Sequence, residues 1–167
     1  DWYAGANSLD TTNNDGWIFD AEPPSPSDRY WVGGTGDWSD TDHWSLTSGG
    51  DSGADKPTAL DNVIFDENSG LDGEIVTVDE AASWKDIIST VPDSYQILFL
   101  QGTTFNAGDF HISGSEGNII ALDSINGGDS FTLSKTAGTV VCDYIDIRNS
   151  TVSGGATWYA GSHSTGV

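Results

Sequence analysis

Residues in the second half of this chain recur at intervals of about 21 positions. Four series keep this spacing: Val76, Ile97 and Asn118; Leu98, Ile119 and Val140; Leu100, Ala121 and Cys142; and Phe110, Phe131 and Val152. Around them apolar and polar residues alternate, which is the pattern of a strand with one buried face. A recurring unit of this length, made of strands and Gly/Asn turns, is typical of a β-solenoid.

The spacing therefore predicts an all-β fold, a parallel β-helix or β-solenoid with coils of about 21 residues. Equivalent residues stack inside such a fold, so we expect Leu98, Ile119 and Val140 to share one interior column. The alternative is an antiparallel β-sandwich with regular hairpins, although a sandwich does not require one spacing in four series. Residues 80–88 are the one segment with a plausible helical turn.

A second repeat joins the two ends of the sequence. The phrase Trp-Tyr-Ala-Gly at residues 2–5 returns at residues 158–161. Self-similarity at a fixed period indicates a tandem array, or a subunit that repeats by assembly. The sequence thus predicts head-to-tail contacts between copies of the chain. The expected contact residues are Trp2, Tyr3, Trp17, Ile18, Phe19, Trp158 and Tyr159.

Proline marks the main boundary of the chain. Three of the 5 prolines fall between residues 21 and 28, which indicates an extended linker. Residues 1–20 then form an N-terminal arm that is expected to pack on a neighbouring copy. Residues 29–167 form the β-solenoid domain, in which residues 29–75 are a Trp- and Gly-rich cap.

The cap carries the pattern WxGGxGxWxDxxxW between Trp31 and Trp44. This pattern, together with the strand-and-turn run from Gly117 to Gly161, resembles tandem-repeat parallel β-helix proteins of the autotransporter-like or virion-associated type. The resemblance implies a long, surface-exposed protein that serves as an adhesin, a fibre or a scaffold.

The charge of the chain excludes several partners. Asp and Glu total 26 against 5 Lys and Arg, so the formal net charge is −21. A surface of this sign repels nucleic acid and anionic lipid. We therefore expect no nucleic-acid partner, and the sequence contains no run of apolar residues that predicts membrane insertion.

A divalent cation is the more plausible ligand of so acidic a chain. Asp37, Asp40 and Asp42 offer three closely spaced carboxylates beside Gly-rich backbone, which suits calcium. The segment lacks the Gly and the distal Glu of an EF-hand loop. A structural calcium ion is thus a prediction, and no cofactor is expected to be required.

The tryptophans allow two interpretations. Trp31, Trp38 and Trp44 either close the end of the core, where open strand edges invite aggregation, or form an exposed platform for sugar rings. The first interpretation fits a structural module, and the second fits a carbohydrate-binding adhesin.

Catalytic patterns are weak. The sequence has no nucleophile elbow and no His pair with metal-ligand spacing, and its single cysteine, Cys142, sits in an apolar run. Asp123, Asp143 and Asp146 are the carboxylates that a polysaccharide-active β-helix would place on adjacent coils. We therefore expect no enzyme.

Taken together, these patterns predict a non-enzymatic structural repeat module of an extracellular filament, fibre or surface appendage, located outside the cell, on its surface or on a virion. Its partners are copies of itself. The alternative is a carbohydrate-binding adhesin or a polysaccharide-active β-helix domain, with glycans as the partner.

Overall fold

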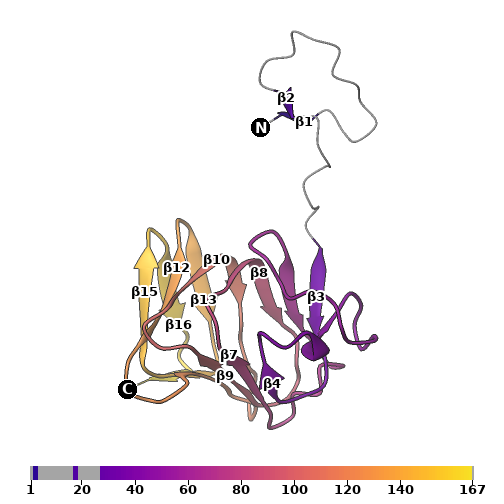
Figure 1. The fold of residues 1–167 in the computed structure, drawn as a ribbon. Coiled ribbons are helices and arrows are strands. Elements are labelled where there is room, and N and C mark those ends of the chain that lie inside the picture. The colour runs from indigo at the N-terminus through magenta and orange to yellow at the C-terminus, as the bar shows by residue number, and fades with distance from the viewer. Residues whose placement is uncertain (1, 4–16, 19–26, 167) are drawn as a thin grey trace.

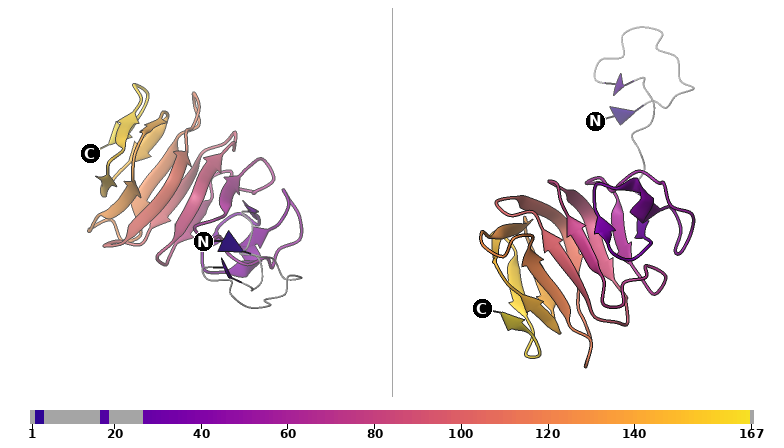
Figure 2. Two further views of the ribbon diagram at one scale, coloured as in Figure 1. Left: turned by 90° about the horizontal axis from the view of Figure 1, so that it is seen from above. Right: turned by 60° about the horizontal axis from the view of Figure 1, so that its bottom comes forward.

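The computed structural model of the protein describes residues 2–3, 17–18 and 27–166. Within these residues the prediction of an all-β fold is confirmed, because every regular element other than one 3-10 turn, η1 (Thr41–His43), is a strand. Figure 1 shows strands in layers, and Figure 2 shows them side by side in chain order. No helix in the described part of the chain is long and apolar enough to cross a membrane.

The largest sheet has seven strands and is called the large sheet below. From edge to edge its strands are β15 (Ser150–Gly154), β12 (Phe131–Lys135), β10 (Thr104–His111), β8 (Ser83–Ser89), β6 (Asn62–Phe65), β3 (Asp28–Trp31) and β5 (Trp44–Ser45). The six-stranded sheet runs through β17 (Thr165–Gly166), β14 (Ile145–Ile147), β11 (Ile120–Ser124), β9 (Tyr95–Phe99), β7 (Ile75–Val78) and β4 (Gly36–Asp37).

Two smaller sheets complete the structure. One pairs β13 (Thr139–Cys142) with β16 (Thr157–Ala160), and the other pairs β1 (Trp2–Tyr3) with β2 (Trp17–Ile18). From β6 to β12 the chain passes alternately between the large sheet and the six-stranded sheet. After β12 and again after β15 it also contributes a strand to the β13–β16 sheet.

The strand pairs are parallel, apart from the antiparallel pair of β3 and β5. Parallel pairing rules out the alternative of an antiparallel β-sandwich, which is built from hairpins. β5 lies at one edge of the large sheet, beside β3, where Trp31 pairs with Trp44.

The core lies between the large sheet and the six-stranded sheet. In β9, Tyr95, Ile97 and Phe99 are buried while the residues between them are partly exposed, as period-two alternation requires. Aromatic side chains of the two sheets stack on one another across the core. The Phe99 and Phe131 rings, for example, are 4.5 Å apart between centroids.

The register of the six-stranded sheet corrects the predicted columns. Val76 pairs with Ile97 as expected, but Ile97 pairs with Leu122 and not with Asn118. The chain inserts a turn before β11, where Ser115 bridges to Asn118, and this shifts the register. Ile119 is consequently 36% exposed.

The predicted column of Leu98, Ile119 and Val140 is therefore wrong. Leu98 pairs with Asp123, and Val140 pairs with Trp158 in a different sheet. The other series are not paired either: Phe110 pairs with Ile87, Phe131 with Ser150, and Ala121 with Gln96 and Asp146. A uniform step of 21 residues is also wrong, because Thr104 pairs with Thr132 while Thr139 pairs with Thr157.

The predicted helical turn at residues 80–88 contains strand β8. Trp84 and Ile87 are both buried, and their spacing imitates a helix. The same interruption of the alternation occurs in β10, where Ala107 and Phe110 pair with these two residues. A side chain at Gly108 would meet the Lys85 carbonyl oxygen at 2.2 Å, so glycine lets the two strands bend together.

The residue before β6 anchors the first strands. Asp61 is buried and accepts hydrogen bonds from the Ser27 amide (3.1 Å) and hydroxyl (2.8 Å) and from the Thr58 amide (2.9 Å) and hydroxyl (2.7 Å). Burial alone would raise the pKa of the Asp61 carboxyl, but the hydrogen bonds from Thr58 and Ser27 outweigh it and lower the pKa.

Candidate functional site

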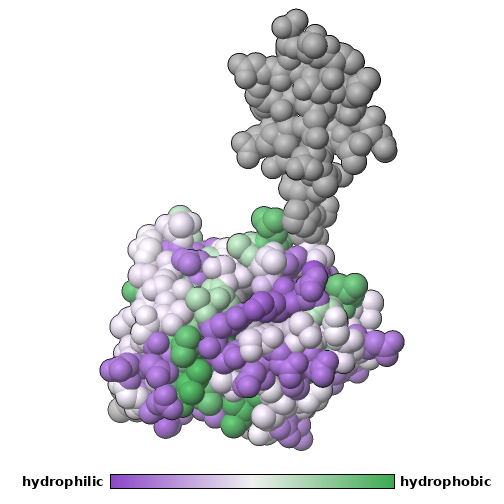
Figure 3. Space-filling model, in the orientation of Figure 1, coloured by the Kyte–Doolittle hydropathy of each residue, from purple (hydrophilic) through white to green (hydrophobic). Residues whose placement is uncertain are grey.

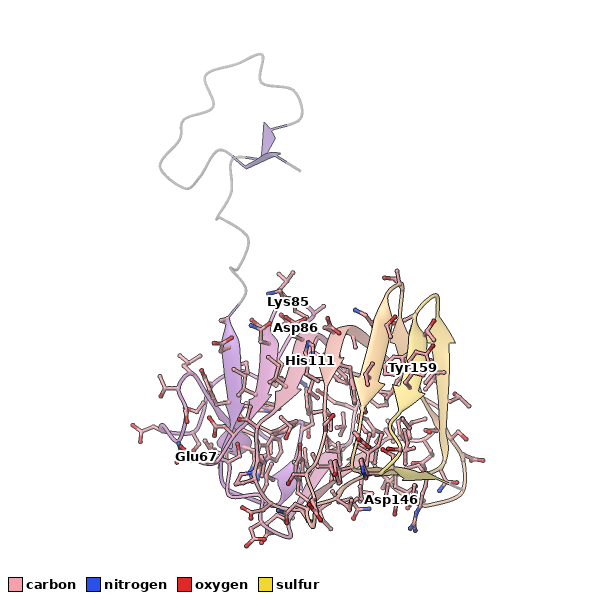
Figure 4. All side chains as sticks on the ribbon, turned by 180° about the vertical axis from the view of Figure 1, so that it is seen from behind. Glu67, Lys85, Asp86, His111, Asp146 and Tyr159 are labelled. Carbon is pink, nitrogen blue, oxygen red and sulfur yellow. The ribbon has the colours of Figure 1, made fainter. Side chains whose placement is uncertain are left out.

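Three edge strands lie at the C-terminal end of the described structure. β15, β16 and β17 are each the last strand of their sheet. Exposed large apolar side chains gather on this end: Val141 is 63% exposed, Val152 52% and Tyr159 58%. Figure 4 labels Tyr159 on the end strands. An edge strand with exposed apolar side chains is a template for pairing with another strand.

An apolar cleft opens beneath these strands. It has a volume of about 480 Å³, and its walls include Phe110, Leu122 and Leu133 from the core and Trp158 from β16. Trp158 is partly buried and packs against Phe110, with ring centroids 5.7 Å apart. On the face drawn in Figure 3, by contrast, hydrophobic residues lie in separate patches among hydrophilic ones.

Cys142 also lines this cleft and is a free, buried cysteine. Burial raises the pKa of its thiol to about 11. The thiol therefore stays protonated at neutral pH and behaves as a small apolar side chain, which is not the state of a reactive nucleophile.

The turn that follows β16 is attached to the strand layer below by Asp143. One carboxylate oxygen of Asp143 accepts from the His163 amide (3.0 Å), and the other lies 2.9 Å from His163 Nδ1. The His163 ring stacks on Tyr144, with 4.5 Å between centroids. The hydrogen bond from His163, which outweighs partial desolvation, lowers the pKa of the Asp143 carboxyl.

Gly161 lets this attachment form. A Cβ at this position would lie 2.4 Å from the Asp143 Cγ, and the Gly161 amide donates to the Cys142 carbonyl oxygen at 2.6 Å. Gly161 is the fourth residue of the repeated Trp-Tyr-Ala-Gly phrase. In the C-terminal copy of the phrase, a residue larger than glycine would therefore collide with the Asp143 carboxyl group.

The predicted contact residues fall into two groups. Trp158 and Tyr159 lie in β16, on the apolar end just described. Trp2 and Tyr3 form β1, which pairs with Trp17 and Ile18 of β2. Phe19 and most of the N-terminal arm and linker lie outside the described residues, although Asp28, the last residue assigned to the linker, begins β3.

The three tryptophans proposed as a sugar platform are buried. Trp31, Trp38 and Trp44 are at most 1% exposed. The indole of Trp31 donates to the Gly34 carbonyl oxygen (2.7 Å), and that of Trp44 donates to the Trp38 carbonyl oxygen (2.9 Å). Their rings pack edge to face, so their faces are directed to one another rather than to solvent.

The predicted calcium ligands lie between β4 and η1. Asp37 ends β4, and the Asp40 carboxylate accepts from the Asp42 amide at 2.9 Å, which caps η1. Among the residues that the structure describes, no group of three His, Cys, Asp or Glu side chains is arranged to hold a metal ion. Calcium binding stays a prediction.

Each of the three carboxylates considered for a polysaccharide-active site has a different hydrogen-bond partner. Asp143 is held by His163, whereas Asp123 accepts from the Asn149 amide nitrogen (2.8 Å) and Asp146 from Arg148 Nη2 (2.6 Å). Asp123 and Asp146 share a cleft of about 80 Å³. Ligand pockets usually hold about 300 Å³ or more, so this cleft is small for a sugar substrate.

Sequence reasoning did not foresee the apolar cleft. Val141 and Tyr159 face solvent, as the expected alternation requires, whereas Val152 lies on the cleft side of β15 and is exposed because no further described strand covers it. The pattern marks a strand but does not tell whether its outer edge is covered.

Comparison with protein-family models, with curated proteins and with solved structures finds no match.

Proposed function

We propose that this chain is a non-enzymatic structural module, a parallel β-solenoid that assembles head to tail into an extracellular filament, fibre or surface appendage. The observation that carries the proposal is the C-terminal end. There the edge strands β15, β16 and β17 frame an apolar cleft of about 480 Å³.

The solenoid interpretation is supported by the exposed faces of the sheets. Parallel sheets usually have both faces covered by helices. Here the described chain contains strands and one short 3-10 turn, so each main sheet has one face on the core and one toward solvent. Alternation of consecutive strands between two parallel sheets also fits a chain that winds around the core.

The resemblance of the Trp- and Gly-rich cap to surface and virion-associated β-helix proteins supports an extracellular location. The net charge of −21 suits a solvated surface. The burial of Trp31, Trp38 and Trp44 gives the adhesin alternative no support, and the volume of the cleft at Asp123 and Asp146 gives the enzymatic alternative little.

Sedimentation velocity of the full chain over a range of concentrations tests the proposal. We expect concentration-dependent self-association that is lost when residues 1–20 are deleted, while the circular dichroism spectrum and the melting temperature of the remaining domain stay unchanged. A full chain that stays monomeric at high concentration, or a truncated chain that still associates, contradicts the proposal.

A further inference from the structure

We propose that Trp17 and Ile18 of a second copy of this chain add as a parallel strand to the free edge of β16, with Trp17 opposite Trp158 and Ile18 opposite Tyr159. This inference rests on the head-to-tail assembly proposed above and adds the pairing strand, its direction and its register.

The register comes from a pair that the chain already forms. β1 and β2 are parallel, with Trp2 opposite Trp17 and Tyr3 opposite Ile18. The sequence of β1 is repeated in β16, where the same Trp-Tyr-Ala-Gly phrase occupies residues 158–161. A strand that pairs with Trp2 and Tyr3 therefore finds the same two residue types at positions 158 and 159 of β16.

The edge of β16 is open to such a partner. Within residues 27–166, β16 pairs with β13 and with no further strand. Its outer backbone groups are therefore available to an added strand, which is the mode of recognition known as β-augmentation.

Successive side chains of a strand point to opposite faces of its sheet, and this determines which side chain of the added strand covers the cleft. Val140 and Cys142 of β13 are buried, and they pair with Trp158 and Ala160. Trp158 thus lies on the cleft side of β16, and the exposed Tyr159 lies on the outer side. In the proposed register the side chain of residue 17 extends the core over Trp158, and that of residue 18 lies beside Tyr159.

The contacts at Trp158 suit this addition. Its indole N–H is shielded from solvent and has no hydrogen-bond acceptor among the described residues. The ring already packs on Phe110 at an angle of 60°, so a further indole adds one more aromatic contact to this pair.

The same geometry makes β1 a competitor of β16. Because β1 belongs to the same chain as β2, the pair is intramolecular and the effective concentration of β1 is high. Assembly then exchanges β1 for the β16 of a neighbour, as in a domain swap. The cleft next to β16 provides the additional apolar contacts that favour the exchange at high protein concentration.

Disulfide trapping tests the register. All chains carry Cys142→Ala, one chain carries Ile18→Cys, and it is mixed with full-length chains that carry either Tyr159→Cys or Thr157→Cys. Opposite residues on neighbouring strands are about 4.8 Å apart at Cα, whereas a shift of two residues raises this to about 8 Å, beyond the reach of a disulfide. Both partner positions lie on the same side of β16 and differ in register alone.

Under mild oxidation we expect crosslinked dimers from the Ile18→Cys and Tyr159→Cys mixture, and about tenfold fewer from the control mixture with Thr157→Cys. Adding Trp2→Ser and Tyr3→Ser to the Ile18→Cys chain removes the competitor and is expected to raise the yield.

The outcomes separate the two proposals. If the mixtures associate in sedimentation but yield no crosslink, or equal amounts of both crosslinks, the strand pairing is wrong and head-to-tail assembly stands. A yield that falls with Trp2→Ser and Tyr3→Ser overturns the exchange with β1. If the mixtures do not associate at all, both proposals fail.

Discussion

A hydrogen bond of 2.9 Å joins the carboxylate of Asp143 to the ring of His163, 20 residues further along the chain. The second carboxylate oxygen accepts from the backbone amide of the same histidine. Asp143 follows β13 and His163 follows β16, so one side chain attaches the turn after the edge strand to the layer beneath it.

This attachment predicts a response to acid. The pKa of Asp143 is lowered in the folded protein, so its stabilising contribution is complete above the unfolded value of about 3.9 and is lost as the pH falls through the lowered folded value. We expect the NMR signal of the His163 amide to titrate with a midpoint below about 3.9. A midpoint at or above that value contradicts the attachment.

Substitution of Gly161 by alanine tests the close approach of the same two layers. The new methyl group meets the Asp143 carboxyl, and the side chain must leave its hydrogen bonds. We expect the melting temperature to fall by about 2–8 °C. Gly128→Ala is the matched control, because nothing lies within 4 Å of the added carbon there. Equal melting temperatures for the two variants contradict the prediction.

The corrected register predicts opposite results for two neighbouring residues. Leu122 is 0% exposed in the column with Ile97, so Leu122→Asp buries an unpaired charge and is expected to cost about 3–5 kcal/mol of unfolding free energy. Ile119→Asp, on the exposed side of the turn before β11, is expected to change it by at most about 0.5 kcal/mol. Urea denaturation measures both, and a larger loss at Ile119 restores the rejected column.

Removal of the buried carboxylate at the other end is expected to weaken the first strands. Asp61→Ala leaves the donors of Ser27 and Thr58 without an acceptor, at a cost of about 2–3 kcal/mol in unfolding free energy. The exposed Asp51→Ala provides the control. Because the pKa of Asp61 is lowered, the difference between the two variants should shrink as the pH falls below about 3.9. A difference that is independent of pH argues against this role for the carboxylate.

Salt is expected to strengthen self-association. Two copies with a formal charge of −21 each repel one another, while the surface proposed for their contact at β16 is apolar. Screening shortens the range of the repulsion from about 30 Å at 0.01 M to about 3 Å at 1 M. The association constant from sedimentation should therefore rise with sodium chloride, and a fall indicates that ion pairs hold the copies together.

The sequence allowed the all-β character of the fold to be predicted but not the register of its strands. Alternation identified strands such as β9 and β12, because each side chain on one face must be buried. The step from one layer to the next depends on turn length, and the turn around Ser115 and Asn118 adds residues that composition does not reveal. The three-residue spacing of Trp84 and Ile87 suggested a helical turn. It comes instead from an interruption of the strand alternation that β8 shares with β10, and the sequence of one strand does not show that its partner has the same interruption.

The candidate site includes two residues that the sequence singles out, although their role as contacts stays a prediction. The repeated phrase drew attention to Trp158 and Tyr159, which the structure places on an edge strand. The cleft behind them is formed by side chains from seven strands, among them Phe110 and Leu133, and such a meeting of distant segments follows from the packing alone. The contact between Asp143 and His163 is equally nonlocal.

The antiparallel strand β5 makes the two ends of the molecule unequal. It pairs antiparallel with Tyr30 and Trp31 on the outer edge of β3, so these two residues are not open to a further parallel strand. The opposite end offers the apolar cleft and the open edge of β16. If copies assemble as proposed, these unequal ends would give the fibre a direction, and each new copy would have to join it in the same orientation.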